Sequence, residues 1–342
     1  MKVTSFRELM REQAKAAVRI SGAHHSSWNE RLRPLPRDGR SGGVAAWDHA
    51  IAYNPEFVDE PLQQMFANAR VHNQDPADLR RYRDALRIVL HENVHMLASQ
   101  GREHGQAKAA FESTPGVRAM EESISEIYSQ QRLDDYIDEM GLDEIAPGIK
   151  DVRTNPVYKQ WLPAAEAFAK TLGNETGLGR DEIVQRLAVV PADQKFTVAA
   201  EAIYDNSDLP GIVPSDQRAQ AVHRIAESMR KPFSQIEGMP ESAPGWQRRL
   251  VGSEAVRQGY LAVDDLKKQW QMPAPGQQIE RGVQQGPQSP AAELPADLAT
   301  AVHASRSGSE PLSSASRLDE NRMGSRRSGT PAGPERTPEI QR

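Results

Sequence analysis

Residues 86–99, LRIVLHENVHMLAS, place two histidines four positions apart, with a glutamate directly after the first. Side chains four apart on an α-helix lie one above the other on the same face. His91 and His95 therefore present both imidazoles to one point, and Glu92, turned by about 100° from His91, reaches past that point. The pattern H-E-x-x-H is typical of two zinc ligands with a glutamate as general base. We therefore predict a site for one Zn²⁺ ion.

The pattern alone would also fit two surface histidines beside an ordinary acid. The apolar run at residues 88–90 argues against this, because it places the motif inside a helix that packs on a core, where unpartnered imidazoles are costly. The helix has marked ends. Asp75 is a predicted N-cap, Pro76 takes the first helical position, and Gly101 is a predicted C-terminal stop.

Catalytic zinc needs a third protein ligand and leaves its fourth position open. His104 is one candidate, although it does not complete H-E-x-x-H-x-x-G-x-x-H, because Ala98 and Gly101 occupy the glycine and final histidine positions of that pattern. Glu121 and Glu122 are the other candidates. The metzincin pattern is therefore excluded, and the choice among the three candidates stays open at this point.

Both glutamates belong to a second predicted helix. We expect it to begin at a cap on Ser113 or Thr114, with Pro115 just inside, and to end at Gly141. Its apolar stripe, formed by residues 117, 120 and 124, lies closer to Glu121 than to Glu122. Periodicity therefore does not select Glu122.

Over residues 44–130 the sequence resembles the gluzincins, the zincin metallopeptidases of the thermolysin and aminopeptidase type. Members carry H-E-x-x-H on one helix and a ligand glutamate on a following helix, and residues 121–126, EESISE, match that second part. Ser123 stands where the family usually has glycine, which is a mild departure. The resemblance implies the following roles: His91, His95 and Glu122 as zinc ligands, Glu92 as general base, and Glu126 as the carboxylate that orients a ligand histidine.

The resemblance also implies a substrate site and an oxyanion donor. An edge strand above the metal would pair with the extended backbone of a peptide or protein substrate, and Ile51, Ala52 and Tyr53 are the predicted strand. A tyrosine or histidine would stabilise the oxyanion. Tyr158 is the favoured candidate, with Tyr128, Tyr204 and His223 as alternatives.

Bulk properties restrict the remaining possibilities. The 342 residues include no cysteine, 6% aromatic residues and a net charge of −5. Without cysteine, any zinc site must use imidazole and carboxylate ligands. The charge lacks the basic footprint of a nucleic-acid-binding protein, and no stretch approaches the roughly 18 apolar residues of a membrane span. The N-terminus has no apolar signal region, so we expect a cytoplasmic protein by default, with signal-independent export possible.

We predict a mainly α fold with a small β-sheet (α+β), zincin-like, in four parts. Residues 1–43 form an N-terminal helix and loop, 44–145 the metal-binding core, and 146–272 a helical subdomain. Residues 273–342 contain no aromatic side chain and are rich in proline, glycine and serine, so we predict a disordered tail.

The predicted function is that of a zinc-dependent metallopeptidase, a hydrolase in which Glu92 takes a proton from the attacking water. A non-catalytic, zincin-like binding or regulatory protein is the alternative. A third possibility, an exported protease effector or toxin, is motivated by the tail alone. The oligomeric state stays open.

Overall fold

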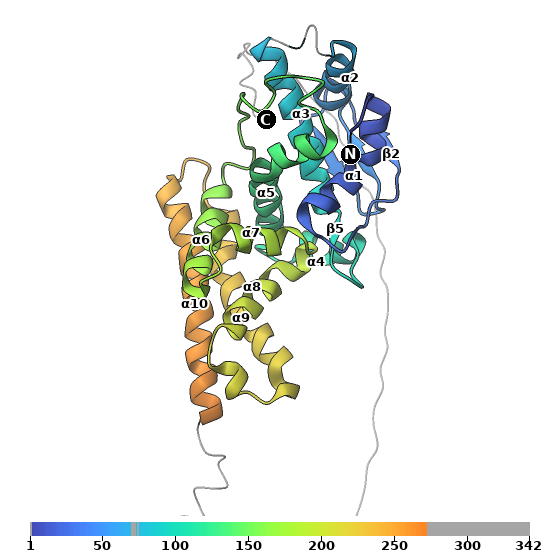
Figure 1. Cartoon of the computed structure of the whole chain (residues 1–342). Coiled ribbons are helices and arrows are strands. Elements are labelled where there is room, and N and C mark those ends of the chain that lie inside the picture. The colour runs from blue at the N-terminus through green and yellow to red at the C-terminus, as the bar shows by residue number, and fades with distance from the viewer. Residues whose placement is uncertain (1, 70–72, 74, 272–342) are drawn as a thin grey trace, which may run out of the picture. The chain divides into compact units, whose positions relative to one another are not determined.

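The computed structural model describes residues 2–69, 73 and 75–271, and the predicted disordered tail lies outside them (Figure 1). The strands of this part of the chain are His25–Ser26 (β1), Leu32–Pro34 (β2), Gly43–Ala45 (β3), Ile51–Tyr53 (β4) and Leu97–Ala98 (β5). The α-helices are Phe6–Ser21 (α1), Glu60–Ala67 (α2), Pro76–His95 (α3), Lys108–Ser113 (α4), Val117–Met140 (α5), Leu162–Thr176 (α6), Arg180–Ala188 (α7), Lys195–Asp205 (α8), Arg218–Phe233 (α9) and Gly245–Gln271 (α10). The predicted mainly α fold with a small β-sheet is confirmed.

Helix α3 begins as predicted and ends earlier than predicted. The Asp75 carboxylate accepts the backbone N–H of Ala77, as an N-cap should. The helix stops at His95, so the predicted stop at Gly101 is wrong. The reason is a tertiary contact, because Leu97 and Ala98 leave the helix to pair as β5 with β1. His95 is therefore the last residue of α3.

Helix α5 also differs from the prediction at its start. It begins at Val117 after Gly116, which adopts a left-handed φ of 87°. The predicted cap at Ser113 or Thr114 is therefore wrong, since Ser113 is the last residue of the short helix α4. The predicted end is confirmed, because Gly141 closes the helix with a φ of 68°.

The three-stranded sheet has the order β2-β4-β3. Strand β4 is parallel to β2 and antiparallel to β3, with Gly43 opposite Tyr53. The predicted edge strand at residues 51–53 is therefore wrong, because this segment is the central strand and all three of its residues are buried. The edge strand beside α3 is β3.

One continuous core runs through the described helices from α1 to α10. In its N-terminal part, α3 and α5 pack along each other, with α1 against both. The later helices continue from α5, which also contacts α6, α7 and α8. Helix α10 packs along α6 and α9, and its Gly252 lets the backbones of α10 and α6 approach closely. The described residues form one compact unit, so the predicted boundaries at 43 and 145 stay predictions. Among the described helices, none has the length and apolar character required to cross a bilayer.

Candidate metal centre

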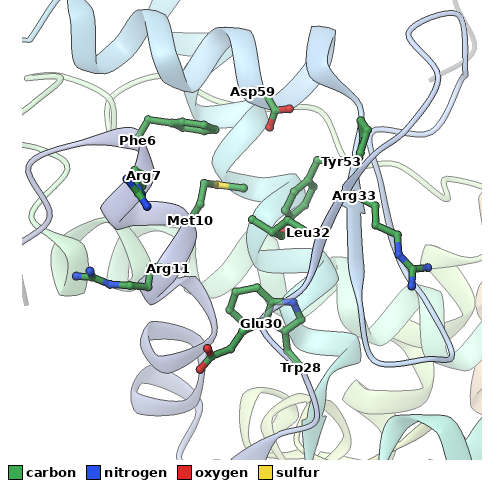
Figure 2. A pocket seen from close by; sticks show the side chains of 11 residues that line it. Phe6, Arg7, Met10, Arg11, Trp28, Glu30, Leu32, Arg33, Tyr53 and Asp59 are labelled. Carbon is green, nitrogen blue, oxygen red and sulfur yellow. The ribbon is translucent and has the colours of Figure 1, made fainter.

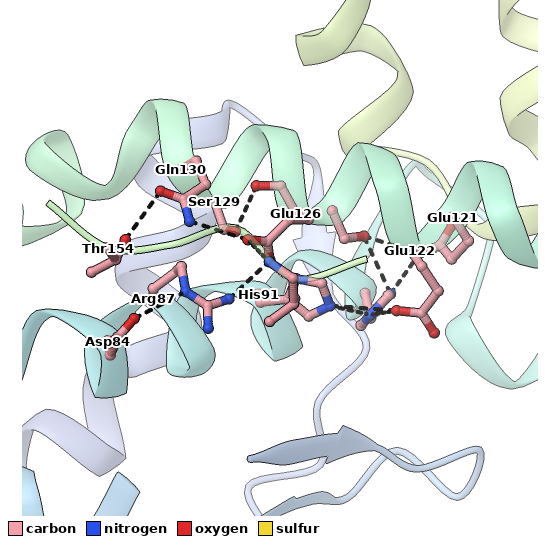
Figure 3. A network of polar contacts seen from close by, with 12 residues as sticks. Asp84, Arg87, His91, Glu121, Glu122, Glu126, Ser129, Gln130 and Thr154 are labelled. Carbon is pink, nitrogen blue, oxygen red and sulfur yellow. Dashed lines mark hydrogen bonds and ion pairs between the residues drawn. The ribbon is translucent and has the colours of Figure 1, made fainter. Parts of the chain in front are cut away.

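Helices α3 and α5 bring three predicted ligands together in the core (Figure 3). The Nε2 atoms of His91 and His95 lie 3.1 Å apart. Glu122 Oε2 lies 3.5 Å from each of them. All three side chains are buried. Three lone-pair-bearing atoms therefore form a nearly equilateral triangle shielded from bulk water.

The size of this triangle matches a metal coordination sphere. Ligand atoms about 2.0–2.1 Å from a tetrahedral zinc ion lie about 3.3 Å from one another. In addition, Glu122 Oε2 is buried and has no hydrogen-bond partner among the residues that the structure describes. Two imidazoles and a carboxylate are also a donor set that catalytic zinc uses. The residues present therefore fit a zinc ion.

Both imidazoles are supported from behind by carboxylates of α5. His91 Nδ1 lies 3.2 Å from Glu126 Oε2, and His95 Nδ1 lies 2.7 Å from Glu121 Oε1. A carboxylate at Nδ1 favours the N–H at that atom and leaves the lone pair on Nε2, inside the triangle. Glu126 thus occupies the place that the sequence suggested, and Glu121 lies outside the triangle, against His95.

His104, the remaining ligand candidate, also lies outside the triangle. Its Nδ1 is 3.0 Å from the carbonyl oxygen of His95, and its Nε2 is 3.3 Å from that of Ala45. The ring stacks on Trp47, with the two ring planes 13° apart. Burial lowers the pKa of His104 to about 4, so the ring is neutral at pH 7. A neutral imidazole carries one N–H, so the ring donates to one of these two carbonyls, which belong to the end of α3 and to the edge strand β3.

Two cations accompany the carboxylates behind the histidines. Arg87 Nη1 lies 2.9 Å from Glu126, and Lys195 Nζ lies 3.0 Å from Glu121. With neutral imidazoles, the buried side chains of the centre comprise four carboxylates and two cations, which leaves a net charge of −2. The four carboxylates are those of Glu92, Glu121, Glu122 and Glu126. One divalent cation would neutralise this cluster.

The pKa values of the ligands follow from the same excess of negative charge. Burial alone would lower the pKa of His95, but Glu121 and Glu122 outweigh it and raise the pKa well above its ordinary value. The pKa of His91 is raised in the same way by Glu122 and Glu126. Conversely, the histidines outweigh burial and lower the pKa of Glu122. Without a metal, the centre attracts protons onto its imidazoles.

Glu92 lies beside the triangle, at the wall of a cleft of about 770 Å³ that His91 and Tyr158 also line. Burial raises the pKa of the Glu92 carboxylate, and the backbone of Ala45 in β3 offsets only part of this effect. An effective general base has a pKa close to the working pH. A raised pKa moves a carboxylate towards that condition at neutral pH. Gly43 packs directly against Glu92, since a Cβ atom there would lie 2.6 Å from Glu92 Cγ.

Tyr158 is the only one of the four proposed oxyanion donors that lines the described cleft. Its ring stacks on that of His91, with centroids 5.7 Å apart and planes 18° apart. Its backbone is left-handed, with a φ of 55°, which is uncommon for a residue with a side chain. Burial and the neighbouring Glu122 and Glu92 raise the pKa of Tyr158, so the phenol keeps its proton.

The residues predicted to bind substrate do not line this cleft. Tyr53 of the central strand β4 donates its hydroxyl hydrogen to Gln13 and borders a different cavity, of about 630 Å³, with Phe6 and Trp28 (Figure 2). Sequence reasoning missed other neighbours of the centre, namely Gly43, Ala45, Arg87 and Lys195. Arg87 was detectable, because it lies one helical turn before His91. The others come from distant segments that carry no motif.

A search of protein-family models, curated proteins and solved structures finds no match to this chain.

Proposed function

We propose that this chain is a zinc-dependent metallopeptidase that binds one Zn²⁺ ion through His91, His95 and Glu122. One observation carries the proposal: the three ligand atoms lie 3.1–3.5 Å apart in a buried triangle, and one of them, His91, lines a cleft together with Glu92. Separations of this size suit tetrahedral zinc, and the cleft provides access for a substrate.

When bound, zinc would supply a Lewis acid that polarises the scissile carbonyl and acidifies a water molecule. Glu92 is the general base in this proposal. It takes a proton from the attacking water and delivers it to the nitrogen of the leaving amine. Gly43 of β3 packs against the Glu92 carboxylate, and burial raises its pKa, which favours proton uptake by this group. Tyr158 keeps its proton and can donate it in a hydrogen bond to the developing oxyanion.

The substrate is proposed to be a peptide or protein in extended form. Strand β3 borders the cleft on one side, and its Gly43 belongs to the cleft wall. An edge strand with free backbone groups can pair with an extended segment of a substrate. β3 thus replaces residues 51–53 in the role first predicted for them. Whether the chain acts in the cytoplasm or after signal-independent export stays a prediction.

The test combines zinc analysis with peptide cleavage. Zinc-loaded protein is incubated with a peptide library derived from a proteome digest, and new termini are identified by mass spectrometry. We expect cleavage by the wild type, loss of cleavage with a chelator, and no cleavage by Glu92→Gln at unchanged zinc content. Glu112→Gln, at an exposed position on α4, is the matched control and should retain cleavage.

Full activity of Glu92→Gln would overturn the role of Glu92. A zinc-loaded wild type that cleaves neither the library nor intact proteins would overturn the peptidase proposal. That result would favour the non-catalytic binding protein instead.

A further inference from the structure

A lysine ammonium group lies in the interior, far along the chain from the motif helix. Lys195 is the first residue of α8, and its side chain is fully buried. Its Nζ atom donates to the carbonyl oxygens of Leu187 and Val190 and forms an ion pair with Glu121 Oε2 at 3.0 Å. Two carbonyl hydrogen bonds and one ion pair therefore surround the ammonium group. A buried charge with this complement of partners is held in one position.

The carboxylate that Lys195 contacts leads directly to a zinc ligand. The second oxygen of Glu121, Oε1, lies 2.7 Å from His95 Nδ1. Ser125 Oγ also donates to this oxygen at 3.4 Å. With the Lys195 ammonium group at Oε2, the Glu121 carboxylate offers Oε1 to His95 as a hydrogen-bond acceptor. The His95 proton therefore belongs on Nδ1, and its Nε2 lone pair faces the triangle.

His91 is supported in a similar way, but by a local cation. Its Nδ1 faces Glu126, and Glu126 is held by Arg87, which lies one turn before His91 on the same helix. The support of His91 is thus confined to α3 and α5. The support of His95 extends to α8 and, through the carbonyls that Lys195 binds, to the end of α7.

We propose that Lys195 is a positioning residue of the metal centre, which acts through Glu121 to fix the orientation and tautomer of His95. This inference rests on the proposed zinc site. It makes zinc affinity depend on how α7 and α8 pack against α5, beyond the segment that carries the motif.

The experiment is a double-mutant cycle with zinc affinity as the readout, measured by competition with a chromophoric chelator at fixed pH. The variants are Lys195→Met, Glu121→Gln and the double variant. We expect each single substitution to weaken zinc binding about 10- to 100-fold, the range found for groups that orient metal ligands. The zinc affinity of the double variant should equal that of the single variant with the lower affinity, because both substitutions remove the same support.

The cycle separates positioning from a general structural role. If Lys195 only held the end of α7, Lys195→Met would weaken binding by the same factor whether residue 121 were Glu or Gln. That additive result would overturn the proposal, as would unchanged affinity of Lys195→Met. Lys195→Gln keeps a donor for the carbonyls but removes the charge. It should weaken zinc binding as much as Lys195→Met does, and it is the control for misfolding of Lys195→Met.

A matched control comes from another buried cation. Arg83 contacts Asp134 at 2.7 Å and the Ile149 carbonyl at 3.2 Å, away from the triangle. Arg83→Met should destabilise the fold and leave zinc affinity unchanged. A wild-type protein that binds no zinc would refute the proposed function. If the wild type and Lys195→Met bind zinc with equal affinity, only the role of Lys195 is refuted.

Discussion

Glu92 occupies a position that depends on the residue facing it. A Cβ atom at Gly43 would lie 2.6 Å from Glu92 Cγ and 2.8 Å from its Oε1, closer than real contacts allow. Any side chain at position 43 therefore displaces the carboxylate or the strand. In the proposed mechanism, proton transfer by Glu92 depends on its position within about an ångström, so a small displacement should lower turnover strongly.

We predict that Gly43→Ala lowers kcat about 100-fold or more, while one zinc ion remains bound per chain. Steady-state kinetics together with metal analysis checks this outcome. Gly238→Ala is the control, since a Cβ there meets no atom within 4 Å, and it should leave kcat unchanged. A Gly43→Ala protein with wild-type kcat would show that Glu92 does not need its present position.

Tyr158 supports a second prediction at this scale. Removing one oxyanion donor typically costs about 10²–10³ in kcat. Tyr158→Phe should show a loss of this size with little change in KM and unchanged zinc content, because the phenyl ring can still stack on His91. Tyr204→Phe, which changes a buried tyrosine outside the cleft, should retain wild-type kinetics. The opposite ranking of these two variants would refute the assignment.

The extent to which elements could be predicted depends on whether their signals are local. The Asp75 cap and the Gly141 stop act within one turn, and both were predicted correctly. The end of α3 at His95 and the central place of β4 depend on strand pairing with distant segments. Sequence patterns alone do not encode these pairings, and both were predicted wrongly.

The same distinction applies to the site. His91, Glu92 and His95 lie on one helix, so their spacing alone brings them together. The choice between Glu121 and Glu122 had no such signal, because residues 119–129 of α5 are all buried and the helix has no solvent face there. Lys195 was missed, since nothing in its sequence context indicates that α8 reaches the centre.

At the scale of elements, the contact between α6 and α10 can be tested. A Cβ at Gly252 would lie 2.0 Å from the carbonyl oxygen of Ala164, so Gly252→Ala must push the two helices apart. Overpacking of this kind typically costs about 1–3 kcal/mol. We expect a melting temperature several degrees below that of the wild type, measured by circular dichroism. Gly211→Ala, where a Cβ meets open space, should melt like the wild type; equal melting of both variants would contradict this packing.

At the scale of the whole molecule, zinc binding should stabilise the fold, and the size of this stabilisation should depend on pH. The raised pKa values of His91 and His95 mean that the metal-free protein holds protons on these rings, and zinc must displace them. Zinc affinity therefore falls as pH falls. The stability that protonated histidines give the metal-free protein is lost as pH rises through their raised pKa values. The stabilisation by zinc thus grows with pH.

We predict that saturating zinc raises the melting temperature by several degrees at pH 8, and by clearly less at pH 6. Differential scanning calorimetry with and without zinc measures both values. His223→Ala, which removes an exposed histidine of α9, should show the same pH dependence as the wild type. Stabilisation that does not change with pH would mean that zinc displaces no protons from these histidines.

The most direct test of the metal centre is the zinc content of the purified protein, measured by inductively coupled plasma mass spectrometry after dialysis. The wild type should retain one zinc ion per chain, whereas His95→Ala and Glu122→Ala should retain almost none. A wild type without zinc after incubation with excess metal, or a Glu122→Ala protein with as much zinc as the wild type, would contradict the three-ligand site.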